Sequence, residues 1–101
     1  MMAAMRPSEV REMLDRELPG WQFREHLIEK EYHLKSFRDA VRLFNAIADL
    51  AEALNHHPRI INVYKRLKVE LWTHTAGGVT EKDFQLARQI EQAAQALGVL
   101  P

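Results

Sequence analysis

Residues 55–74 read Asn-His-His-Pro-Arg-Ile-Ile-Asn-Val-Tyr-Lys-Arg-Leu-Lys-Val-Glu-Leu-Trp-Thr-His, and this stretch decides the fold. Residues 60–64 and 67–74 are rich in β-branched and aromatic side chains, which is typical of strands. Lys65-Arg66 lies between them as a candidate tight turn, so the stretch predicts an antiparallel hairpin. Apolar and polar residues alternate in the second strand, which predicts that one face of the hairpin is buried.

Three of the five histidines of the chain fall at the open end of this hairpin. His56 and His57 precede the first strand, and His74 closes the second. Counting outward from the turn in both directions places His57 opposite His74. Imidazole both gives and takes protons near neutral pH, so the group predicts a proton-transfer site or a metal site. Pro58 is expected to stiffen the bend, because it fixes its own φ and restricts the residue before it.

The spacing of these histidines favours proton transfer over metal binding. Adjacent residues such as His56 and His57 usually point in different directions, and the chain has no His-Glu-x-x-His or His-x-His motif. It also has no cysteine, which excludes disulfides and thiolate sites. We therefore expect no bound metal. A single histidine at a helix end can also be a simple partner of the helix dipole.

In the sequence, one helix is predicted before the hairpin and one after it. Ser36 and Asp39 form a capping-box pattern, and so do Thr80 and Asp83. Apolar residues at helical spacing follow the first box, and we expect them to form one buried face: Phe37, Val41, Phe44, Ala48, Ala51 and Leu54. The corresponding buried positions after the second box are Phe84, Ala87, Ile90, Ala94 and Leu97.

The N-terminal third predicts one more helix and one more hairpin. Residues 1–7 are expected to be a loose leader, with Ser8 capping a helix over residues 9–18. Pro19-Gly20 ends this helix. Residues 21–34 predict two antiparallel strands, with the turn near either Glu25-His26 or Glu29-Lys30.

The predicted fold is a single α+β domain over residues 1–101. It has two layers, with a four-stranded antiparallel sheet and helices packed on one face, in the order α-β-β-α-β-β-α. Fourteen basic residues balance fourteen acidic ones, which argues against a nucleic-acid binder. No apolar run approaches a membrane span, and the start lacks the apolar core of a secretory signal, so we expect a cytoplasmic protein without a membrane association.

The blocks around the histidines resemble the pterin-4a-carbinolamine dehydratases of the bacterial type. These blocks are Glu52-x-x-Asn55-His56-His57-Pro58, Asn62-Val63-Tyr64, Leu71-x-Thr73-His74 and Gly78-Val79-Thr80-x-x-Asp83. The resemblance runs from about residue 21 to residue 94. It implies the same sheet-and-helix fold and a hydro-lyase reaction, in which 4a-hydroxytetrahydropterin loses water to give quinonoid dihydropterin. That reaction recycles a tetrahydrobiopterin-type cofactor.

The resemblance also implies roles for the histidines. His56 and His74 would be the acid/base pair, and His57 would mainly hold the pterin, although the division of labour among the three stays open. Independently of the resemblance, Glu52 precedes His56 by four residues and is expected to accept a hydrogen bond from its imidazole.

Residues that flank the histidines complete the predicted site. Those expected to contact the pterin, some through backbone groups, are Asn55, Trp72, Thr73 and Thr75. Those expected to support the site are Glu52, Pro58 and Asp83, of which the two acids would orient imidazoles or close the site.

The pterin is the substrate, so the resemblance implies no cofactor. Functional coupling to an aromatic amino acid hydroxylase is possible, and the assembly is expected to be a homodimer or a homotetramer. The alternative is a non-catalytic interaction or assembly module, like the animal members that bind a homeodomain transcription factor. A role in another pterin pathway, such as molybdopterin metabolism, also stays open.

Overall fold

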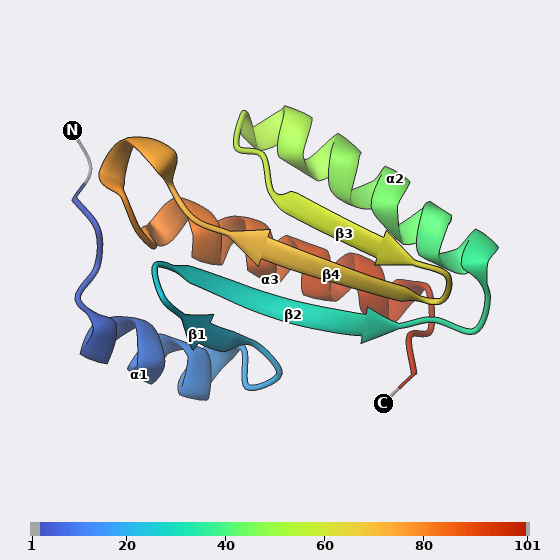
Figure 1. The fold of residues 1–101 in the computed structure, drawn as a ribbon, viewed down its shortest axis with the longest axis horizontal. Helices are drawn as coiled ribbons and strands as arrows, with labels where there is room; N and C mark the ends of the chain where they lie inside the picture. The colour runs from blue at the N-terminus through green and yellow to red at the C-terminus, as the bar shows by residue number, and fades with distance from the viewer. Residues whose placement is uncertain (1–2, 101) are drawn as a thin grey trace.

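A computed structural model describes residues 3–100 as a four-stranded antiparallel sheet with three α-helices (Figure 1). The elements follow one another as α1 (Pro7–Glu17), β1 (Gln22–Arg24), β2 (Leu27–His33), α2 (Phe37–Leu54), β3 (Arg59–Val63), β4 (Arg66–Leu71), the 3₁₀ turn η1 (His74–Ala76) and α3 (Glu81–Ala96). The strand order is β1-β2-β4-β3, and all neighbours are antiparallel. The predicted α+β fold and its element order are confirmed.

The core lies between one face of the sheet and the helices. Leu67, Val69 and Leu71 of β4 point into it and are fully buried, as their alternation predicts. The apolar face of α3 is also confirmed, with Phe84 and Ile90 fully buried. In the part of the chain that the structure describes, no helix is long and apolar enough to cross a membrane.

A partly buried carboxylate ties α3 to the sheet. Glu91 Oε1 accepts hydrogen bonds from Trp21 Nε1 (3.1 Å), Lys30 Nζ (2.5 Å) and Tyr32 OH (2.6 Å). Burial by itself would raise the pKa of Glu91, but the donors on Lys30 and Tyr32 outweigh it and hold that pKa below its ordinary value. The ionised carboxylate therefore fixes where α3 lies against β2.

The buried face of α2 differs from the predicted one. Its buried residues are Ala40, Leu43, Ile47 and Ala51, of which only Ala51 was predicted, whereas Phe37 and Phe44 are 53% and 40% exposed. The helix has apolar residues over about half its circumference, so periodicity alone does not determine which part faces the core. The predicted apolar residues do lie along one side of α2, but most of them are on the surface instead of in the core.

The turn of the second hairpin comes one residue earlier than predicted. Val63 pairs with Arg66, so the turn consists of Tyr64 and Lys65 rather than Lys65-Arg66. Tyr64 has a left-handed backbone conformation, with φ 53°. Asn62 stabilises the turn, because its Nδ2 donates to the carbonyls of Tyr64 (3.2 Å) and Arg66 (2.9 Å).

This shift corrects the predicted pairing of the histidines. Arg59 faces Glu70 at the last pair of the ladder, so the outward count that placed His57 opposite His74 was wrong. β4 ends at Leu71, and His74 begins η1 instead of closing the strand.

The first hairpin turns at Glu25-His26, the first of the two predicted positions, because Arg24 pairs with Leu27. Glu25 supplies the left-handed residue of that turn, with φ 56°.

The N-terminal segment packs on the domain from residue 3 onward. The Met5 amide donates to the Val79 carbonyl (2.8 Å), and a Cβ added at Gly78 would lie only 2.9 Å from the Ala4 side chain. Residues 3–7 are thus anchored rather than loose, and residues 1 and 2 of the predicted leader lie outside the described residues.

Arg6, not Ser8, occupies the N-cap position of α1. Pro7 is the first helical residue, where its missing N–H costs no hydrogen bond. The carboxylate of Glu9 accepts from the Arg6 amide (3.0 Å), which satisfies the start of the helix.

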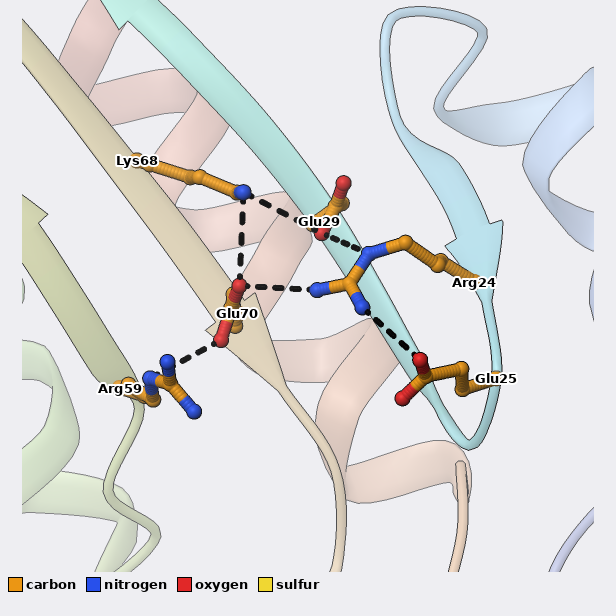
Figure 2. A network of polar contacts seen from close by, with 6 residues as sticks. All are labelled: Arg24, Glu25, Glu29, Arg59, Lys68 and Glu70. Carbon is orange, nitrogen blue, oxygen red and sulfur yellow. Dashed lines mark hydrogen bonds and ion pairs between the residues drawn. The ribbon is translucent and has the colours of Figure 1, made fainter.

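A charged network crosses the outer face of the sheet, away from the helices (Figure 2). Glu29 and Glu70 lie directly opposite each other on β2 and β4. Arg24 bridges them, with Nε 2.9 Å from Glu29 Oε1 and Nη2 3.0 Å from Glu70 Oε2. Lys68 and Arg59 lie 3.6 Å and 3.2 Å from the Glu70 carboxylate. Opposed like charges destabilise a sheet, so these cations allow Glu70 to remain 2% exposed.

We predict that Glu70→Gln lowers the free energy of unfolding by about 1–2 kcal/mol, because it removes the charge that three cations share. Urea unfolding measures the loss. Glu31→Gln, an exposed change on the same face, is the matched control and should stay within about 0.5 kcal/mol of wild type. Equal effects of the two variants would contradict a stabilising role for the network.

Candidate active site

The bend that carries His56 and His57 depends on the conformation of Asn55. Asn55 has φ 49° and ψ 46°, the left-handed conformation that ends many helices. The His56 amide consequently donates back to the Ala51 carbonyl (3.0 Å), which closes the end of α2. Asparagine tolerates this conformation better than most residues, so the sequence turns the chain sharply at this point.

His56 points toward the start of α3, where Asp83 holds it. His56 Nε2 lies 2.5 Å from Asp83 Oδ1, and the His56 side chain is 11% exposed. Asp83 itself is 0% exposed. Sequence reasoning predicted Glu52 as the partner of His56, and this pairing was wrong, because Asp83 occupies that place.

The other oxygen of Asp83 is also satisfied. Oδ2 accepts from the Thr73 hydroxyl and from the Thr80 backbone amide, both at 2.9 Å. The bond from the Thr80 amide is half of the predicted capping box, which is confirmed. Asp83 therefore joins the end of α2, the segment after β4 and the start of α3 in one buried set of hydrogen bonds.

His57 lies apart from this buried set. Its side chain is 56% exposed, with Nε2 3.7 Å from Glu52 Oε1. Glu52 thus pairs with the second histidine of the predicted site rather than the first. A small cavity of about 210 Å³ between α2 and β3 is lined by Glu52, His57 and Pro58 together with apolar side chains.

His74 and Thr75 lie in η1, directly after Thr73, and both are exposed. The carbonyl of Thr73 accepts from the Ala76 and Gly77 amides (3.1 and 3.0 Å), which forms the turn. Gly77 ends it with φ 69°, where a side chain would be strained. Because Thr73 also binds Asp83, this turn places His74 at the same end of the sheet as His56.

Trp72 directly follows β4 and is partly buried. Its ring contacts His26 of the β1–β2 turn, with ring centroids 5.3 Å apart at an interplanar angle of 80°. A contact between Trp72 and a pterin stays a prediction. His26 belongs to no motif and was not predicted as a site residue, yet it lies next to Trp72, which was.

These side chains can perform acid/base chemistry. One imidazole is held by a buried carboxylate, and two further imidazoles are open to solvent, which is an arrangement that exchanges protons with a bound molecule. Across residues 3–100, no three His, Cys, Asp or Glu side chains gather in a way that could hold a metal ion.

Sequence reasoning missed the hydroxyl pair that supports Asp83. Thr73 Oγ1 lies 2.7 Å from Thr80 Oγ1, and both side chains are buried. A signal was present, because Asp83 precedes Ala87 by four residues and Ile90 by seven on the apolar face of α3. A carboxylate on a buried helix face needs donors from elsewhere in the fold.

Comparison with known proteins shows the family to which this fold belongs. The family described as pterin 4 alpha carbinolamine dehydratase matches residues 3–93. A relative from Synechococcus sp. (strain WH7803), named for the same dehydratase, is 41% identical over 90 residues, which cover 89% of this chain and 97% of that protein. One from Aquifex aeolicus (strain VF5), also so named, is 39% identical and covers 96% and 97% of the two chains.

Solved structures agree with the sequence matches. A crystal structure of a transcriptional coactivator/pterin dehydratase from Brucella melitensis superimposes with a TM-score of 0.85 at 38% identity, covering 90% of this chain and 98% of that one. A pterin dehydratase-like protein described as a RuBisCO assembly factor has a TM-score of 0.62 at 20% identity and shares the fold.

The fold and the imidazole site define a small α+β protein of the pterin dehydratase class. More particularly, the chain belongs to the pterin 4 alpha carbinolamine dehydratase family.

We predict that Asn55→Val lowers the free energy of unfolding by roughly 1–2 kcal/mol, because a β-branched residue is strained in the left-handed conformation. Asn55→Gly is the matched control and should unfold close to wild type, because glycine adopts this conformation freely. Chemical denaturation measures both. If the two variants lost the same stability, the side chain of Asn55 would be the stabilising feature instead of its backbone conformation.

Proposed function

We propose that this protein catalyses the dehydration of a 4a-hydroxytetrahydropterin to a quinonoid dihydropterin. In this reaction the C4a–O bond breaks, the N5–H proton leaves and a C4a=N5 double bond forms, with one water released. The departing hydroxyl needs an acid, and the N5 proton needs a base. Neither a covalent nucleophile nor a redox step is required.

The observation that carries this proposal is the buried pair of His56 and Asp83 in a chain of this family. A carboxylate that holds an imidazole in one orientation reduces the entropy lost when the imidazole meets its substrate. His57 is the next residue in the chain, and His74 directly follows Thr73, which donates a hydrogen bond to Asp83. We assign to these two histidines the second proton-transfer group and a contact for the pterin. The pterin is the substrate, and the reaction as proposed uses no cofactor.

Self-association is part of the proposal. Phe37, Val41 and Phe44 form an exposed apolar stripe on α2, and each is at least 38% exposed. Edge strand β3 adds exposed Ile61 and Val63, and one of its sides faces no other strand. Monomers rarely leave such apolar surface in water. We assign it to a second copy of the chain, which gives a homodimer or a homotetramer.

A non-catalytic interaction module is the second candidate. The Brucella structure is named for a coactivator as well as a dehydratase, and the fold also occurs in a protein described as an assembly factor. The exposed stripe on α2 is compatible with such a partner. The organised His56–Asp83 pair favours the enzyme, because a purely adhesive surface does not need an oriented imidazole.

We predict that the purified protein accelerates the decay of the 4a-carbinolamine absorbance produced by an aromatic amino acid hydroxylase. His56→Ala and His74→Ala should each lower the catalysed rate by about 10²-fold or more, since each removes an acid/base group.

The matched control is His33→Ala. His33 is exposed and lies opposite Arg66 in the β2–β4 ladder, near the other end of the sheet. It should keep the wild-type rate. A wild-type protein that leaves the uncatalysed decay unchanged would reject the enzyme and favour the interaction module.

We also predict that the double variant Val41→Glu/Phe44→Glu dissociates, because two buried carboxylates would be unpaired in an interface between copies. Light scattering coupled to size exclusion gives the mass. Arg38→Glu, on the polar face of the same helix, should keep the wild-type mass. A monomeric wild type would contradict the assignment of the stripe to a second copy.

A further inference from the structure

Two buried hydroxyl groups, those of Thr80 and Thr73, form a chain of hydrogen bonds that ends at Asp83. Thr73 Oγ1 lies 2.7 Å from Thr80 Oγ1 and 2.9 Å from Asp83 Oδ2. The three residues are 5%, 1% and 0% exposed, in the order Thr73, Thr80 and Asp83. Their hydrogen bonds are therefore made to one another, to the backbone and, through Asp83 Oδ1, to His56.

The direction of each bond follows from counting protons. A threonine hydroxyl has one proton to donate. Thr80 Oγ1 accepts from the Lys82 amide (3.3 Å), which leaves its own proton for Thr73. Thr73 therefore accepts from Thr80 and donates to Asp83 Oδ2. The Thr80 amide also donates to Oδ2, so this oxygen acts as an acceptor in both of its contacts.

Asp83 Oδ1 is then left to face His56 Nε2 at 2.5 Å. An ionised carboxylate can only accept, so Nε2 carries the proton. In a neutral imidazole the lone pair then resides on the other nitrogen, Nδ1. Among the described residues the hydrogen bond of the His56 ring is made by Nε2, and the side chain is 11% exposed.

We infer that His56 exchanges its proton with the pterin through Nδ1, and that Thr73 is a positioning residue that holds this tautomer through Asp83. The inference rests on the proposed dehydration for its chemical consequence. Nδ1 takes the proton from N5 or, once protonated, gives one to the departing hydroxyl. Throughout, Nε2 keeps its proton and its hydrogen bond to Asp83. The hydroxyl of Thr73 thus acts through Asp83 rather than on the pterin.

The tautomer is measured directly by ¹⁵N NMR of histidine-labelled protein over a range of pH that includes the neutral form of the imidazole. The His56 signals are those lost in His56→Gln. We expect a protonated Nε2 and an unprotonated Nδ1. A protonated Nδ1 would overturn the inference. This measurement needs no pterin and no turnover. A lack of dehydratase activity would therefore reject the proposed function without affecting the result of the tautomer test.

Variants of Thr73 test its role. Thr73→Val keeps the volume and removes the donor, and we expect mixed His56 tautomers with a kcat lowered roughly 10- to 100-fold at nearly unchanged KM. Thr73→Ser keeps the hydroxyl and should show the single wild-type tautomer and the wild-type kcat. If Thr73→Val instead raised KM and left the His56 signals unchanged, Thr73 would contact the pterin and the inference would fail. Should Thr73→Val not fold, the wild-type tautomer and Thr73→Ser still decide.

Discussion

The buried carboxylate of Asp83 is the constraint on which the rest of the site depends. A bare carboxylate in a protein interior costs several kcal/mol, so the fold must surround it with donors. Its three hydrogen-bond partners come from separate places in the chain: the imidazole of His56, the hydroxyl of Thr73 and the amide of Thr80. The end of α2, the exit of β4 and the start of α3 are consequently held together by one side chain.

Buried carboxylates are stabilised in different ways on the two faces of the sheet. On the helix face, Asp83 and Glu91 are satisfied mainly by hydrogen bonds from neighbouring elements. On the outer face, Glu70 is surrounded by arginine and lysine side chains that cover it while staying partly in water themselves. The first arrangement positions a reactive imidazole. The second holds four strands together and leaves the outer face polar.

Much of the fold followed from local patterns. The alternation in β4, the caps at Ser36 and Thr80 and the apolar face of α3 are short-range features, and the structure confirms them. The errors have one physical origin. The choice between two apolar faces of α2, and a hairpin register that moved by one residue at Tyr64, depend on what packs against them.

Local patterns in the chain predicted the order of elements, the histidines at one end of the hairpin and the family to which those blocks are similar. That His56 pairs with Asp83 while His57 lies near Glu52 is a result of tertiary packing. Residues 56 and 83 are far apart in the chain, and no periodicity links them. Their contact exists because a buried carboxylate on α3 needs a donor, and the left-handed turn at Asn55 brings one to it.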